Sequence, residues 1–327
     1  MDLRTVFLND ADRLRSGWRL ALFVLLYVVL MFLATTAVRI FYALMVYVAP
    51  GVRSVGYLED LIFRFILIVT SLGAGYVCTR WLEGLPWRAL GLSFHTRWLR
   101  DFLVGSAIGI ASLALATAIA FAGKGLRFSF SPVNMFPAVL KTLVVTAIIF
   151  TIAALGEEAL FRGYPLQTLA RARLAWLGVL LTSLPFAMAH LDNPNAGSRL
   201  ASANTVLAGV WLAVAYLKTR SLWFPLGVHW AWNWALGSLF GLPVSGITRL
   251  APNPLMHATD LGPAWLTGGS YGIEGGVACT ITLVIATLFI WRTGLVSATE
   301  EMKRMTSQEN PQGPAHQVTP QDEAFQG

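Results

Sequence analysis

Eight apolar runs, each about as long as a bilayer is thick, divide this chain and limit what it can fold into. A helix needs roughly 20 mostly apolar residues to cross the hydrocarbon core of a membrane. Because lipid offers no hydrogen-bond partners, the backbone of such a run must satisfy its own polar groups, and each run therefore predicts a helix. We predict an all-α fold, a polytopic membrane helical bundle of about eight transmembrane helices, at residues near 19–38, 60–82, 101–122, 138–160, 174–191, 202–217, 222–241 and 274–292.

The composition excludes a soluble globular domain. Hydrophobic residues make up 56% of the 327 residues and charged residues 13%, and the mean hydropathy is +0.61. The net charge of +7 does not indicate nucleic-acid binding, because cytoplasmic loops of membrane proteins are rich in Lys and Arg. Most basic residues fall in alternate loops, which predicts that both termini face the cytoplasm. The two cysteines, Cys78 and Cys279, lie in apolar segments, so the sequence indicates neither a disulfide framework nor a thiolate metal site.

The chain divides into a short N-terminal segment, one membrane domain and a tail. Residues 1–18 predict a cytoplasmic N-terminal segment, and residues 19–294 predict the eight-helix membrane domain. Residues 295–327 are polar and almost free of aliphatic bulk, so we expect a disordered cytoplasmic tail. The long loop between residues 243 and 273 is rich in Gly and Pro and is expected to fold back over the bundle, with Glu274 at the membrane interface.

An acidic pair closes the fourth apolar run. Glu157 and Glu158 are followed by Arg162, and charged groups within a membrane segment are costly enough to suggest a function. Glu158 and Arg162 are one helical turn apart, so we expect them to form an ion pair. Glu157 points about 100° away and is left without that partner, as a general base would be. The alternative is that both carboxylates face water at the membrane interface.

Two further motifs lie on the fifth and seventh runs. Phe186 and His190 share one helix face, and His229 and Asn233 share another. The imidazole and carboxamide of the second motif could donate hydrogen bonds to an oxyanion. Taken singly, His190 could instead be a helix-end residue, and His229 with Asn233 could be a packing contact between membrane helices.

The three motifs together supply a base, a second imidazole and an oxyanion-binding pair, which are the groups required for peptide hydrolysis by water. A straight helix from Arg173 to His190 would be roughly 25 Å long. We therefore predict that His190 reaches Glu157 only if the fifth helix starts deep, tilts strongly or breaks near Pro185. A proton- or ion-coupled transporter that uses the same groups as a relay is one alternative function, and a non-catalytic membrane scaffold or immunity protein is another.

The motifs Glu157-Glu158-xxx-Arg162, Phe186-xxx-His190 and His229-xxx-Asn233, in this order, resemble those of the CAAX prenyl protease and bacteriocin-processing (CPBP, Abi) family of intramembrane proteases. The resemblance is strongest between about residues 139 and 237. Looser likeness to bacterial members lies near the N-terminus, at residues 90–94 and in the loop before Glu274, and it implies a location in a bacterial inner membrane.

The resemblance implies a role for each motif residue. Glu157 would activate water, His190 would assist it or bind a metal, and His229 with Asn233 would stabilise the oxyanion. The supporting residues would be Glu158, Arg162 and Phe186.

This interpretation leaves open whether the protein binds a cofactor, because the site is compatible with no metal or with a single zinc held by His190 and His229. We expect a membrane-embedded or lipidated peptide as substrate, no nucleic acid, and a cavity that opens toward the cytoplasm.

Overall fold

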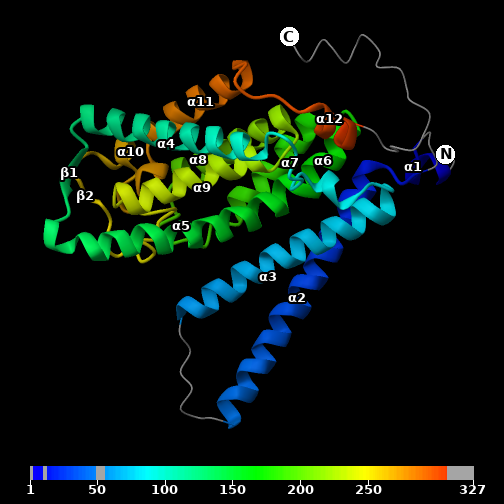
Figure 1. The fold of residues 1–327 in the computed structure, drawn as a ribbon, viewed down its shortest axis with the longest axis horizontal. Coiled ribbons are helices and arrows are strands. Elements are labelled where there is room, and N and C mark those ends of the chain that lie inside the picture. The colour runs from blue at the N-terminus through cyan, green and yellow to red at the C-terminus, as the bar shows by residue number, and fades with distance from the viewer. Residues whose placement is uncertain (1–2, 10–12, 49–55, 308–327) are drawn as a thin grey trace.

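The computed structural model describes residues 3–9, 13–48 and 56–307, and it shows a helical bundle with most helices aligned along one axis (Figure 1). Helices α1 and α12 lie at one end, called here the terminus end, and a two-stranded sheet lies at the other, called the sheet end. The elements are α1 (Leu3–Phe7), α2 (Ser16–Val48), α3 (Gly56–Val77), α4 (Trp98–Ala122), β1 (Leu126–Phe130), α5 (Phe136–Glu158), α6 (Tyr164–Arg171), α7 (Ala175–Met188), α8 (Arg199–Thr219), α9 (Trp223–Trp234), β2 (Met256–Asp260), α10 (Ala264–Thr267), α11 (Val277–Arg292) and α12 (Glu300–Ser307).

The prediction of a helical membrane bundle is confirmed, whereas the number of eight spans is not. Among the described residues, five helices are long and apolar enough to cross a membrane: Ser16–Val48, Leu61–Leu82, Trp98–Ala122, Val133–Arg171 and Arg199–Thr219. Helices α7 and α11 are apolar but shorter, and α9 has 12 residues before a π-helical turn. The first span is also longer than predicted, because α2 continues to Val48. Element bounds of this kind depend on packing partners that composition does not reveal.

The fourth span runs past its predicted end at residue 160. Helix α5 continues through a π-helical turn at Ala159–Gly163 into α6, and the apolar helix ends only at Arg171. Pro165 does not end the apolar helix: it lies in the first turn of α6, directly after a local departure from helical geometry at Gly163 (φ −62°, ψ −113°). The π-helical turn begins directly after Glu158, and such turns are frequent at functional sites.

Three glycines bring α4 and α9 into backbone contact. A Cβ on Gly105 would lie 2.3 Å from the Phe224 carbonyl oxygen, and one on Gly109 would lie 2.4 Å from that of Val228. Gly227 faces α4 in the same way from α9. Small residues allow this approach between membrane helices, where close packing replaces the hydrophobic effect as the driving force. The contact fixes the position of α9, which carries His229.

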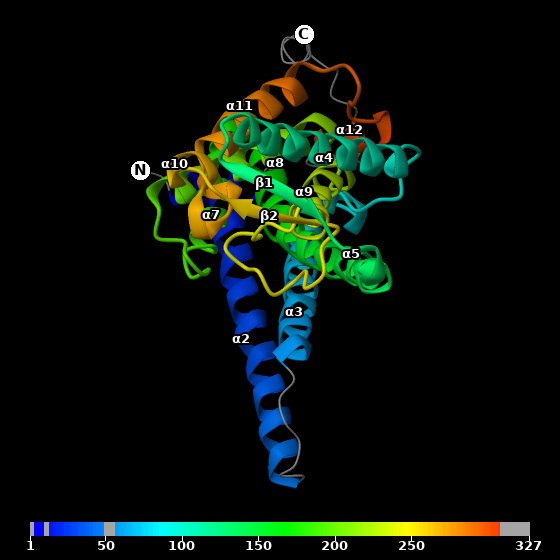
Figure 2. The same cartoon turned by 90° about the vertical axis from the view of Figure 1, so that its left-hand side faces the viewer.

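A small antiparallel sheet closes one end of the bundle. Strand β1, after α4, pairs with β2, with Leu126 opposite Asp260 and Phe130 opposite Met256 (Figure 2). The sequence interpretation contained no strand, because each segment has five residues within a loop. The sheet ties the loop after α4 to the long loop before α11.

Helices α2 and α3 form a hairpin that diverges from the other helices (Figures 1 and 2). Only 6% of the most apolar window of α2 is buried in the protein, which is consistent with a lipid-facing surface. At the terminus end a buried carboxylate, Glu83, anchors this hairpin to α6. It accepts hydrogen bonds from Arg19 Nη1 at 3.1 Å, from Thr168 Oγ1 at 2.6 Å and from Arg171.

The predicted disorder of residues 295–327 is wrong for the part that the structure describes. Residues 300–307 form α12, with Met302 fully buried, and Arg88 Nη2 lies 2.7 Å from Glu301 Oε1. The reason is local spacing: Met302 and Thr306 are one turn apart and bury one face of a short helix. Composition alone could not reveal this face. Residues 308–327 lie outside the described part of the chain.

The loop between α9 and α11 folds back over the bundle, as predicted. Its Gly246 N–H donates to the Tyr271 carbonyl at 3.0 Å, and the Leu255 N–H donates to the Ser238 carbonyl at 2.8 Å. Glu274, which we expected at the membrane interface, instead lines a cavity inside the bundle. Its side chain is held there by hydrogen bonds that the sequence did not indicate.

Candidate active site

Three side chains from separate elements meet around one point. Glu157 comes from the end of α5, His190 from the turn after α7, and His229 from the middle of α9. Glu157 Oε2 lies 3.9 Å from His190 Nε2 and 3.8 Å from His229 Nε2. The predicted convergence is therefore confirmed as geometry. The three side chains converge in a fold where helix α7 is short and ends at Met188, three residues after Pro185.

The Glu158–Arg162 pair forms as predicted and also holds His229. Arg162 Nη1 lies 3.2 Å from Glu158 Oε1, and both side chains are fully buried. The same Glu158 oxygen lies 2.8 Å from His229 Nδ1, so it fixes the ring of His229. Arg162 also donates to the Gly209 carbonyl at 3.1 Å, and its guanidinium lies over the Phe186 ring at 4.5 Å. This group connects α5, α7, α8 and α9 at the site.

The backbone orients the second imidazole. His190 Nδ1 lies 2.8 Å from the Phe186 carbonyl oxygen, and the two rings pack with centroids 4.7 Å apart. A carbonyl only accepts, so Nδ1 of His190 carries the proton. The predicted packing of Phe186 beside His190 is thus present in the structure.

The hydrogen-bond partners leave three acceptor atoms directed at one another. His190 donates from Nδ1 to a carbonyl and His229 donates from Nδ1 to a carboxylate, so in the neutral rings both Nε2 atoms present lone pairs toward Glu157. Glu157 Oε2 is buried and has no hydrogen-bond partner among the described residues. Separations of 3.8–3.9 Å are too long for direct hydrogen bonds and suit a donor placed between the groups. A water molecule is the simplest such donor.

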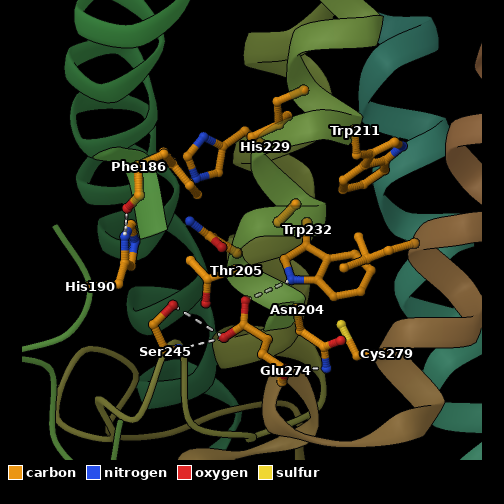
Figure 3. A pocket seen from close by; sticks show the side chains of 14 residues that line it. Phe186, His190, Asn204, Thr205, Trp211, His229, Trp232, Ser245, Glu274 and Cys279 are labelled. Atoms are coloured by element: carbon orange, nitrogen blue, oxygen red, sulfur yellow. Dashed lines mark hydrogen bonds between the residues drawn. The ribbon is translucent and has the colours of Figure 1, made fainter. Parts of the chain in front are cut away.

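A cavity of about 50 Å³ lies beside the two imidazoles (Figure 3). Asn233 lines it one turn beyond His229, as the spacing predicts, while Glu157 lies just outside the lining. The remaining wall is largely aromatic and aliphatic, with a few polar groups. A space of this size holds a few water molecules or a small side chain.

Sequence reasoning missed Glu274 as a residue of this cavity. Its Oε1 accepts from Trp232 Nε1 at 3.0 Å and its Oε2 accepts from the Ser245 N–H at 2.5 Å (Figure 3). Burial raises the pKa of the Glu274 carboxyl, and the hydrogen bonds from Ser245 and Trp232 oppose part of that rise. The available signal was a single acidic residue within a run of glycines. It was not enough, because the spacing placed Glu274 on no helix shared with the other motifs.

Asn204 is a second residue that sequence reasoning did not single out. Its Nδ2 donates to the backbone carbonyls of Glu274 and Gly276 at 2.8 and 2.9 Å, and its Oδ1 accepts from Thr280 Oγ1 at 2.7 Å. Asn204 therefore joins α8 to α11 along one wall of the cavity. It is a polar residue on an apolar helix, a pattern that occurs at many packing contacts between membrane helices.

The described residues contain no group of three His, Cys, Asp or Glu side chains arranged closely enough to hold a metal ion as they stand. His190 and His229 are the two nitrogen donors of the site, and a catalytic zinc requires a third protein ligand. Cys78 and Cys279 are both buried and not disulfide-bonded.

The fold and the site define a helical membrane protein with a glutamate and two histidines grouped inside the bundle. Residues 139–235, which include all three motifs, match the family model for Rce1-like type II CAAX prenyl endopeptidases. This match confirms the family resemblance drawn from the motifs, and it is a match to a family of proteases.

One curated relative gives a broader alignment. The chain is 33% identical over 161 residues to an uncharacterized 24.3 kDa protein of Escherichia coli. The alignment covers 48% of this chain and 64% of that relative, so the chain spans less than two thirds of the relative's length. No solved structure matches the chain.

Proposed function

We propose that this protein is an intramembrane endopeptidase of the CAAX-protease type, in which Glu157 activates a water molecule that attacks a peptide bond. The observation that carries the proposal is the unpartnered Oε2 of Glu157, which faces the Nε2 atoms of His190 and His229 at 3.8–3.9 Å. A base with no other partner, beside two imidazoles and a cavity, is the arrangement that water-dependent hydrolysis needs.

The reaction follows from these positions. The water oxygen bonds to the carbonyl carbon while one of its protons passes to Glu157. The carbonyl oxygen becomes an oxyanion, and the Asn233 amide donates a hydrogen bond to it. His229 joins as a second donor when its Nε2 takes the proton from Glu157. The C–N bond then breaks as the amine nitrogen takes up that proton, which leaves a carboxylic acid and a neutral amine. The acid gives its remaining proton to the amine, so the products are a carboxylate and an ammonium group.

Glu158, Arg162 and Phe186 act by position. Glu158 fixes His229 through Nδ1, Arg162 neutralises Glu158, and Phe186 holds His190 through its backbone carbonyl. Without Glu158, the ring of His229 could rotate away from Glu157, so the partner of each catalytic imidazole is part of the machinery.

The proposed substrate is a hydrophobic or lipidated polypeptide that the enzyme cuts near its C-terminus or in a membrane-proximal part. The apolar helices make this an integral membrane protein. We further propose that both termini face the cytoplasm and that the membrane is a bacterial inner membrane. A transporter or a scaffold is supported by no separate feature of the site.

Replacing Glu157 tests the function directly. We expect Glu157→Gln to abolish cleavage, because an amide cannot accept the proton of water, while the melting temperature in detergent changes little. The measurement is a comparison of protein termini in membranes from cells with wild-type protein or Glu157→Gln, and the matched control is the exposed Glu300→Gln. Identical sets of termini in the wild type and Glu157→Gln would reject the protease. Loss of substrate-dependent proton flux in liposomes would support the transporter instead, and an unchanged biological effect would support the scaffold.

The metal content is tested separately. Elemental analysis of purified wild-type protein, His190→Ala and His229→Ala decides between the two forms of the site that the sequence left open. A stoichiometric zinc that is lost in both variants would assign the histidines as ligands.

A further inference from the structure

Glu274 lines the cavity beside the proposed catalytic residues, and the reaction described above does not use it. The same lining includes His190, His229 and Asn233. In Figure 3 the Glu274 carboxylate points into the cavity from the loop side, toward the side on which His229 lies. The carboxylate and the proposed reacting groups therefore share one small space.

The backbone around Glu274 is held in place by close contacts. Asn204 Nδ2 donates to the carbonyls of Glu274 and Gly276 at 2.8 and 2.9 Å. A Cβ on Gly268 would lie 1.8 Å from the Gly272 carbonyl oxygen, so two turns of the loop pack backbone against backbone. Gly268 also has a φ of +83°, a conformation that favours glycine. The loop thus holds the carboxylate at a set position, as a binding group requires.

The charge of Glu274 has no cationic partner in the part of the chain that the structure describes. No lysine or arginine there forms an ion pair with it. Its hydrogen bonds come from neutral donors, Trp232 Nε1 and the N–H and hydroxyl of Ser245. The buried carboxylates of Glu83 and Glu158, by contrast, are paired with arginine. An interior charge without a counter-charge is costly, and its presence beside a site indicates a ligand that donates positive charge.

One acceptor position of Glu274 is left for such a ligand. An ionised carboxylate has about four lone-pair sites. Trp232 occupies one on Oε1, and the two donors of Ser245 occupy Oε2. A free position therefore remains on Oε1 of a side chain that lines the cavity. A group that binds there must donate a hydrogen bond, and a cationic donor binds most strongly.

The geometry of a peptide bond indicates which donor this is. In a trans peptide the C=O and N–H bonds point in opposite directions. In the proposed reaction the carbonyl oxygen faces His229 and Asn233 on α9. The N–H of the same bond then faces the loop side of the cavity, where Glu274 lies. After cleavage this nitrogen carries the new ammonium group.

We propose that Glu274 is the substrate-binding residue for the amine side of the cut bond: its carboxylate accepts the N–H of the scissile amide and then holds the ammonium group of the fragment that gains a new amino terminus. The proposal deepens the proposed function and rests on it. The space of about 50 Å³ takes an ammonium group with a small side chain beside it. The cavity is thus the subsite of the new amino terminus.

Binding of short peptide amides tests the subsite without a cleavage step. The probes are alanyl-leucine amide, which is an ammonium ion at about pH 7, and its uncharged N-acetyl form. In isothermal titration calorimetry we expect the detergent-solubilised wild type to bind the free amine about tenfold more tightly, because charge-assisted hydrogen bonds are the stronger ones. Glu274→Gln should bind both probes equally. The exposed Glu300→Gln is the matched control and should keep the preference.

A second variant and a third probe separate binding from a structural role. Glu274→Asp keeps the charge on a shorter side chain and should keep part of the preference for the free amine. Complete loss in a folded Glu274→Asp, or a preference that survives in Glu274→Gln, would overturn the proposal. Equal affinity of the wild type for both probes would do the same without any variant. Nα-acetyl-lysine amide, whose amine is in the side chain, should bind weakly; tight binding would assign Glu274 to a cationic side chain instead.

Cleavage separates this proposal from the proposed function. With a substrate identified from the termini of Glu157→Gln cells, we expect alanyl-leucine amide to inhibit Glu274→Gln about tenfold less than the wild type. Equal inhibition of the two would overturn the subsite while the endopeptidase stands. Identical termini in wild-type and Glu157→Gln cells would instead remove the proposed function, which the binding experiment does not measure.

Discussion

At the scale of single residues, the site depends on a buried cation. Arg162 lies between Glu158, the Gly209 carbonyl and the Phe186 ring, and no part of it is exposed. Taking an ion pair out of water is costly, and its members tolerate burial only while each keeps its partner. This explains why Glu158, adjacent to the proposed base, is not itself available for chemistry.

Removing Arg162 should destabilise the protein strongly. We expect Arg162→Met to lower the free energy of unfolding by about 3–5 kcal/mol, because it leaves the Glu158 carboxylate buried without its cation. The measurement is unfolding of the detergent-solubilised protein by SDS, followed by circular dichroism. The double variant Glu158→Gln/Arg162→Met should recover part of the loss, and the exposed Arg304→Met serves as control. A loss equal to that of the control would show that the pair does not stabilise the fold.

At the scale of elements, the contact between α4 and α9 sets where His229 and Asn233 lie. Gly105, Gly109 and Gly227 leave no room for a Cβ between the two backbones. The α9 backbone is thereby held at one distance from α4, and the imidazole of His229 meets Glu158 and Glu157 at 2.8 and 3.8 Å. The geometry of the proposed site is thus determined partly by residues that have no side chain.

A larger side chain in this contact should impair catalysis. We expect Gly109→Leu to separate α4 from α9 and to lower kcat by at least about tenfold, since a displacement of about 1 Å at a reacting group can cost that much. The assay is cleavage of a substrate identified from the termini of Glu157→Gln cells. Ala107→Leu, on the exposed face of the same helix, should leave kcat unchanged. Equal activity of both variants would contradict this account.

The loop before α4 contains a buried histidine. His95 Nε2 lies 3.1 Å from Ser221 Oγ and 3.7 Å from Asp101 Oδ2, and its Nδ1 accepts from the Arg97 N–H at 3.3 Å. Burial lowers the pKa of His95, nearby Arg97 lowers it further, and Glu301 on α12 opposes both. The neutral ring therefore joins the loop to the start of α9.

Acid should weaken this connection. The unfolded chain binds a proton on His95 near pH 6.5, whereas the folded chain binds it only at lower pH, so stability is complete above pH 6.5 and falls as the pH drops below it. We expect His95→Gln, which keeps a hydrogen bond but does not titrate, to lose less melting temperature than the wild type between pH 7.5 and 5.5. The raised pKa of Glu274 acts in the opposite direction in both proteins and cancels in the comparison. Parallel melting curves for the two proteins would contradict the assignment.

At the scale of the whole molecule, the buried carboxylate of Glu83 joins the α2–α3 hairpin to the rest of the bundle. The α2–α3 hairpin diverges from the bundle and exposes apolar side chains along α2, a surface that suits lipid rather than water (Figure 2). Glu83 ties this hairpin to α6 through Arg19, Thr168 and Arg171. The network lies at the terminus end and joins the hairpin to α6, the helix that follows α5 and the π-helical turn after Glu158.

Neutralising Glu83 should destabilise the protein without changing the chemistry. We expect Glu83→Gln to lower the free energy of unfolding by about 3–5 kcal/mol, because the buried guanidinium groups of Arg19 and Arg171 lose their ion pairs with the Glu83 carboxylate. At a temperature where the variant is folded, its kcat should equal that of the wild type, whereas Arg162→Met should lose both stability and kcat. The exposed Glu59→Gln is the matched control. A loss of kcat at full stability would place Glu83 in the site.

The sequence by itself determined the helical membrane class and most of the proposed site. Apolar length predicts helices wherever lipid removes competing hydrogen-bond partners, and spacing along one helix predicted the Glu158–Arg162 pair, the packing of Phe186 on His190, and the common face of His229 and Asn233. These inferences succeed because they concern neighbours within one element, where covalent geometry fixes the distances.

Only the tertiary structure decided what depends on contacts between distant segments. It placed Glu274 and Asn204 in the cavity, paired β1 with β2, buried Met302 in a segment whose composition suggested disorder, and joined the α2–α3 hairpin to α6 through Glu83. The physical reason is that burial is a property of the partner as much as of the residue. A polar side chain in an apolar chain is equally costly everywhere, and only packing shows which hydrogen bonds make its position stable.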